Sequence, residues 1–143
     1  MSNFITKYIR EKDMHRSEFR KPATLEQIDI LEENLGISLP VDYRDFLSFT
    51  DGFEGFIDSW FVRFSSVEQL FPEMQEYCNE FFPWAVCIGT NGGGEMFVID
   101  KRQVPYQFGI LPSIGGDEDF FPLGDTFEKL ILRLYNDTAF DRL

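Results

Sequence analysis

The segment CIGTNGGGEMFVID, from Cys87 to Asp100, limits the fold of this chain more than any other stretch. Two apolar runs flank a turn that contains Asn91 and Gly92, and two further glycines follow. An Asn-Gly pair between apolar runs is the strongest short-range signal for a β-hairpin. We therefore predict two antiparallel strands here, WAVCIG and EMFVID.

A glycine-rich loop can also hold a phosphate, but this loop lacks the residues for it. A Walker loop places a lysine after its last glycine, whereas Glu95 follows Gly94 here. A dinucleotide-binding loop needs a helix directly after its glycines, so that the helix N-terminus meets the pyrophosphate. Because EMFVID is strand-like, the hairpin is the favoured interpretation.

Two amphipathic helices are predicted near the N-terminal end. TLEQIDILEENLGISLP begins at Thr24, where Gln27 completes a capping box, and Gly36 suits a left-handed stop. Pro40 fits the first turn of a second helix, PVDYRDFLSFT. The apolar faces recur at helical spacing: Leu25, Ile28, Leu31 and Leu35 in the first helix, and Tyr43, Phe46, Leu47 and Thr50 in the second.

Further elements follow along the chain. Residues 56–64 predict one strand with Phe56, Trp60, Val62 and Phe64 on one side, interrupted by Asp58. Ser65 and Glu68 then predict a capping box for a helix that Pro72 breaks or restarts.

The C-terminal part predicts strands at residues 106–111 and 120–123 and then a helix capped by Asp125, with Glu128 in the box position. The apolar stripe of this helix is Phe127, Leu130, Ile131 and Leu134.

The order of these elements predicts an α+β fold, a mostly antiparallel sheet packed against N-terminal helices and a C-terminal helix. We expect one domain over residues 1–143. Residues 1–22 form an N-terminal extension, in which Phe4, Ile5, Tyr8 and Ile9 allow a short helix. Residues 10–22 read as a mobile connection.

Charge is distributed unevenly. The formal net charge of the chain is −12, but residues 1–22 hold six basic and three acidic residues. The remaining residues therefore include seven basic and 22 acidic ones. Between residues 46 and 100, Arg63 is the one basic residue against nine carboxylates. Such a surface repels nucleic acid and anionic membranes and attracts basic partners. The N-terminus shows no secretory pattern, so we expect a cytoplasmic protein.

Composition also argues against catalysis and metal binding. The chain has one histidine, His15, and two cysteines, Cys78 and Cys87, which we expect to be buried thiols. Their spacing matches no usual zinc pattern, and a nucleophilic triad would have to use His15. The carboxylates of GGDEDF lack the alternating oxygen ligands of a calcium loop. We predict no enzyme activity, no metal and no cofactor.

The segment LEQIDILEENLGISLPVDYRDFLSFTDGFEG resembles the SUKH superfamily, which includes fungal cell-wall-synthesis regulators and many bacterial immunity proteins. The residues that match its motif are Leu35, Gly36, Leu39, Pro40, Tyr43, Phe46, Leu47 and Gly52. Asp51 departs from the asparagine that the family often has there. The resemblance extends over roughly residues 23–135, and it implies the same α+β fold, with the motif residues serving that fold.

The resemblance implies a non-enzymatic binding protein. Many bacterial members neutralise a cognate secreted toxin by binding it, and these toxins are often nucleases, which are basic because their substrate is anionic. We therefore expect an immunity protein for a toxin domain. The candidate contact residues are Asp51, Glu54, Asp58, Trp60, Asp117, Glu118 and Asp119, although Trp60 also suits a core position.

Two other hypotheses stay open from the sequence. One is an intracellular interaction module, as in the fungal regulators, with no toxin partner. The other is a carboxylate-based hydrolase or a small-ligand protein, which requires a deep cleft with converging carboxylates and raised pKa values. The toxin, the contact face and the oligomeric state are open as well.

Overall fold

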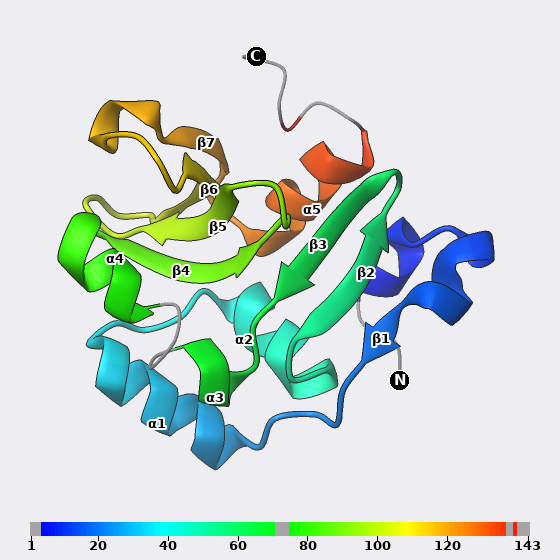
Figure 1. The fold of residues 1–143 in the computed structure, drawn as a ribbon. Helices are drawn as coiled ribbons and strands as arrows, with labels where there is room; N and C mark the ends of the chain where they lie inside the picture. Colours follow the sequence, from blue (N-terminus) through cyan, green and yellow to red (C-terminus); the bar gives the residue numbers. More distant parts are fainter. Residues whose placement is uncertain (1–3, 71–74, 137–138, 140–143) are drawn as a thin grey trace.

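The computed structural model describes residues 4–70, 75–136 and 139, and its centre is one antiparallel sheet (Figure 1). The sheet has seven strands that lie side by side in chain order, each antiparallel to its neighbour. The strands are β1 (Glu18–Phe19), β2 (Phe53–Ile57), β3 (Trp60–Phe64), β4 (Ala85–Thr90), β5 (Glu95–Asp100), β6 (Gln107–Pro112) and β7 (Phe121–Gly124).

Helices cover both faces of this sheet. The α-helices are α1 (Leu25–Leu35), α2 (Val41–Phe49), α3 (Val67–Gln69), α4 (Glu76–Phe81) and α5 (Phe127–Tyr135), and the 3-10 helices are η1 (Phe4–Tyr8), η2 (Glu11–Arg16) and η4 (Asp117–Asp119). The main core joins one face of the sheet to α1, α2, α5 and η1. A smaller core lies on the opposite face, beneath α4. The α+β prediction is therefore confirmed.

The glycine-rich segment forms the predicted hairpin between β4 and β5. Gly92 and Gly94 have φ angles of 78° and 98°, which favour glycine. The Asn91 side chain organises the turn, because its Oδ1 accepts hydrogen bonds from the backbone nitrogens of Gly93 and Glu95 at 2.8 and 3.2 Å. The segment is thus a turn between two strands.

The first two helices also follow the sequence. Thr24 and Gln27 form the capping box, and Gly36 ends α1 with a φ of 72°. One predicted core residue of α1 is wrong: Leu25 is 66% exposed, because it lies in the first turn, outside the buried stripe. Pro40 is the N-cap of α2, and the predicted face of α2 is fully buried.

Phe127 lies at the centre of the main core. Its ring contacts five other aromatic rings, whose centroids lie 4.9 to 5.9 Å from its own: those of Phe4, Tyr43, Phe46, Phe64 and Phe108. These rings come from η1, α2, α5 and two strands, so aromatic packing connects the helical layer to the sheet.

The prediction of one strand over residues 56–64 is wrong. The chain turns at Asp58, which has a φ of 55°, and β2 and β3 form a hairpin that pairs Ile57 with Trp60. The interruption that Asp58 made in the apolar pattern was the turn itself. Phe56 therefore lies opposite Phe61 on the other face of the sheet from Trp60.

Two helix starts differ from the prediction by one residue. The backbone nitrogen of Ser65 still donates to Ile88 O at 2.9 Å beside β4, so Ser66 caps α3 in its place. Thr126 caps α5, while the predicted cap, Asp125, pairs with Lys129 Nζ at 2.7 Å. The expected break at Pro72 lies outside the described residues.

The N-terminal extension is folded onto the domain. The sequence predicts a short helix over Phe4–Ile9, and the structure has η1 there. Tyr8 Oη donates to Glu128 Oε2 at 2.9 Å, and this bond, with Lys7, lowers the pKa of Glu128. The predicted connection over residues 10–22 contains η2 and β1, which pairs with β2.

Candidate protein-binding surface

The carboxylate of Asp51, the first predicted contact residue, forms a hydrogen bond within the chain. Its Oδ1 accepts a hydrogen bond of 2.8 Å from the backbone nitrogen of Val67 at the start of α3. Burial raises the pKa of Asp51 above its ordinary value, although this bond acts in the opposite direction. Its carboxylate is therefore engaged by the first backbone nitrogen of α3.

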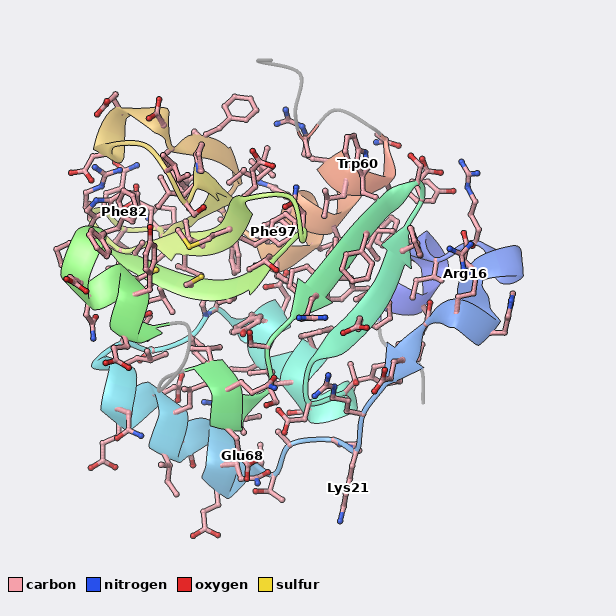
Figure 2. The ribbon with its side chains drawn as sticks, in the orientation of Figure 1. Arg16, Lys21, Trp60, Glu68, Phe82 and Phe97 are labelled. Atoms are coloured by element: carbon pink, nitrogen blue, oxygen red, sulfur yellow. The ribbon has the colours of Figure 1, made fainter. Side chains whose placement is uncertain are left out.

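The predicted residues of the β2–β3 hairpin also have partners in the chain. Glu54 Oε1 lies 2.9 Å from Arg63 Nε, and Asp58 forms an ion pair with Arg10. Trp60 is half-buried and packs against the main core, and Figure 2 shows it near the tip of the hairpin. In this hairpin, arginine side chains therefore offset the negative charges of Glu54 and Asp58, and the ring of Trp60 is packed.

The three predicted acidic residues of GGDEDF form η4, in the connection from β6 to β7. Asp117 Oδ1 accepts a hydrogen bond of 2.9 Å from Trp84 Nε1, and Asp119 Oδ2 accepts one of 2.8 Å from the Gly116 nitrogen. Glu118 is exposed. The β2–β3 hairpin lies toward one edge of the sheet and η4 lies toward the other, so the structure does not bring the seven predicted residues together (Figure 1).

Exposed carboxylates also lie on the helices α1 and α3, which contact each other, and on α4, which packs on the other face of the sheet. We call these helix surfaces together the acidic helical side, and its exposed carboxylates are Glu26, Asp29, Glu33, Glu68, Glu76 and Glu80. Figure 2 shows Glu68 at its outer edge. Arg44 faces the same region but is engaged by Asp29 at 3.3 Å and by Glu32. Lys21, just before α1, is exposed near Glu68, so among the described residues the carboxylates of this region outnumber its cations (Figure 2).

None of these helical carboxylates is among the seven contact residues predicted from the sequence. The signal was present in α1, where Glu26, Asp29 and Glu33 occupy the positions between the residues of the apolar stripe. Positions opposite the buried stripe of an amphipathic helix face solvent, so their charges add to the surface field.

The described residues do not contain a group of three or more potential metal ligands close enough to hold an ion. His15 is exposed, and both cysteines are free and buried. The carboxylate of Asp51, whose pKa burial raises, serves as a helix cap. In the part of the chain that the structure describes, no helix is long and apolar enough to cross a membrane.

Comparison with known proteins identifies the family. The chain is 29% identical over 113 residues to YnaB of Bacillus subtilis (strain 168), an uncharacterised protein, and the match covers 77% of this chain and 74% of YnaB. The model of the SMI1 / KNR4 family (SUKH-1) matches residues 22–133. This range includes the helix–Leu-Pro–helix motif, the glycine hairpin and most of α5. The chain belongs to the SMI1 / KNR4 family (SUKH-1).

Proposed function

We propose that this chain is a non-enzymatic immunity protein that binds and neutralises a bacterial toxin domain, a basic nuclease, in the cytoplasm. Membership of a family that includes immunity proteins supports this proposal. The observation that carries it is the acidic helical side, where six exposed carboxylates on three helices outnumber the nearby cations Lys21 and Arg44, the second of which is paired with Asp29.

The charge distribution suits a partner that itself binds nucleic acid. A nuclease presents basic residues along its substrate groove, because it has to bind a polyanion. A carboxylate-rich protein surface is complementary to that groove, and complementarity of this kind accelerates association and excludes wrong partners. Binding over the groove would deny the nuclease its substrate without any chemical step.

The direct test is co-expression with the C-terminal domain of a large secreted protein encoded beside this gene. We expect cells that produce both proteins to survive, and the two chains to co-purify as a complex. The association rate should fall steeply as salt is added, because salt screens the attraction between the opposite charges. A toxin domain with an inactivating substitution serves as the control for binding without toxicity.

The same experiment separates the proposal from the interaction-module hypothesis. Cell death together with the absence of a complex would contradict the immunity role for that toxin. A stable complex with a cellular protein other than a toxin, in a genome without a neighbouring secreted protein, would favour the module.

A further inference from the structure

We propose that the exposed face of α4 is the centre of the contact with the toxin domain. Tyr77 and Phe81 lie one helical turn apart with their ring centroids 4.8 Å from each other. They are 36% and 53% exposed, and Ile114, in the nearby connection from β6 to β7, is 94% exposed. We call Tyr77, Phe81 and Ile114 the α4 patch. The inference rests on the proposed function for the identity of its partner.

Hydrogen bonds hold the two parts of the α4 patch together. Tyr77 Oη donates to the carbonyl oxygen of Ser113, next to Ile114, at 2.6 Å. Ser113 in turn donates to Gly94 O from its backbone nitrogen at 2.8 Å and from its Oγ at 2.9 Å. The helix, the β6–β7 connection and the glycine turn are therefore tied to one another. A surface fixed in this way loses little conformational entropy when a partner binds.

The smaller core supports the α4 patch from beneath. Cys78, on the inner face of α4, and Phe82, which follows the helix, are buried against β4, β5 and β6. Trp84 packs edge-on to Phe120 at 5.4 Å and donates to Asp117, which fixes η4 beside α4. Aromatic residues are enriched at protein interfaces, and tyrosine is among the residue types that most often dominate the binding energy.

Carboxylates border the α4 patch. Glu76 and Glu80 form the neighbouring row on α4, and Glu118 is exposed on η4. Arg102, a cation near this surface, is bound by both carboxylate oxygens of Asp100 at 3.0 Å and stacks over the ring of Trp84. Its charge is thus neutralised within the chain.

This combination selects a basic protein as the occupant. An apolar and aromatic centre with an acidic border binds a protein surface that carries arginine or lysine, whose cations can also lie over the rings of Tyr77 and Phe81. Nucleic acid and anionic lipid would be repelled by the same carboxylates. Among the proteins that this chain would meet under the proposed function, the basic toxin domain has this chemistry.

The test measures the affinity of the purified chain for the neighbouring toxin domain by calorimetry. Phe81→Ala should weaken binding at least about tenfold, as expected for truncation of a central aromatic contact. Glu80→Lys should weaken it by a similar factor, and more at low salt than at high salt. Leu132→Ala is the matched control, since Leu132 is 40% exposed on α5, which packs on the opposite face of the sheet. Glu18→Lys, on the exposed edge strand β1, is the control for charge.

A photoreactive phenylalanine analogue at position 81 supplies a second measurement. It should crosslink to the toxin domain, whereas the same analogue at position 132 should not. If the wild type binds and neutralises the toxin domain, and the two α4 variants bind within twofold of it, the proposed contact surface is wrong while the proposed function stands. If the wild type forms no complex with the toxin domain, the proposed function fails, and this partner for the α4 patch fails with it.

Discussion

Asp42 Oδ2 lies 2.8 Å from the backbone nitrogen of Glu128, so a residue in the first turn of α2 caps the first turn of α5. Its Oδ1 accepts a second hydrogen bond, of 3.2 Å, from the Phe127 nitrogen. A carboxylate at a helix N-terminus satisfies unpaired backbone amides and interacts favourably with the helix dipole.

Asp42→Ala should therefore lower the free energy of unfolding by about 1–2 kcal/mol. Asp42→Asn should cost less, because the amide keeps one oxygen acceptor for the backbone nitrogens. Urea denaturation of the three proteins at neutral pH measures the difference. Equal midpoints for wild type and Asp42→Ala would show that α5 does not depend on this cap.

Tyr43 offers a stabilising substitution. Its side chain is fully buried, and its hydroxyl has no hydrogen-bond partner among the described residues. Burial accordingly raises the pKa of Tyr43. Tyr43→Phe should raise the free energy of unfolding by about 1 kcal/mol, because it removes an unsatisfied polar group and keeps the ring contacts. Tyr43→Leu, which loses the edge contact to Phe127, should be destabilised instead, and thermal unfolding compares the two.

Asp51→Asn should have a pH-dependent effect. Burial raises the pKa of Asp51 in the folded state above its ordinary 3.8, so the ionised form costs folding free energy at neutral pH. This cost disappears as the pH falls below the unfolded value. The asparagine variant can still accept from Val67, so it should be more stable at pH 7 by less than about 1 kcal/mol, since water screens the partly exposed carboxylate. The difference should vanish near pH 3.5, whereas Asp51→Ala should be destabilised at both pH values.

Two motif glycines should differ in their sensitivity to alanine. Gly52 has a φ of 96°, and a Cβ there would lie 2.8 Å from Phe64 O. Gly52→Ala should thus destabilise the fold by about 2–4 kcal/mol through both strain and overlap. Gly36 has a φ of 72° but open space around it, so Gly36→Ala should cost only about 1 kcal/mol. Urea midpoints that rank the two variants in the opposite order would contradict this account.

The two cysteines should be unreactive in the native protein. Both are fully buried, and a hydrogen bond with Cys78, together with burial, raises the pKa of Cys87 well above its ordinary value. An aromatic disulfide reagent at pH 8 should react at least about 100-fold more slowly with the native chain than with the chain in denaturing urea. Rapid native reaction of one thiol would mean that α4 opens readily from the sheet.

Much of the fold could be predicted because local sequence specifies it. Thr24, Gly36 and Asn91 act through their own neighbours, so spacing alone places the ends of α1 and the turn between β4 and β5. The predictions that proved wrong concern residues whose local structure depends on tertiary contacts. Ser65 has the side chain of a helix cap, but its pairing with Ile88 keeps it at the end of the strand.

The candidate surface was harder to predict, because a sequence does not show which carboxylates already have partners. Asp51, Glu54 and Asp58 look equivalent to any other acidic residue until Val67, Arg63 and Arg10 are seen beside them. Tyr77 and Phe81 present the converse case. Neither is among the residues predicted from the sequence, and the packing of Cys78 in the smaller core shows which side of α4 is outside.

The contact of η1 with α5 affects the order in which the chain can fold while it is being synthesised. Each strand pairs with the strand synthesised before it, so the sheet can grow in the order of translation. Phe4 and Tyr8 precede every strand in the chain, so they must wait for Phe127 and Glu128. The part of the apolar face that α5 covers therefore stays open until α5 has left the exit tunnel, whereas α1 and α2 can cover their part earlier. An exposed apolar surface of this kind makes a growing chain prone to aggregation.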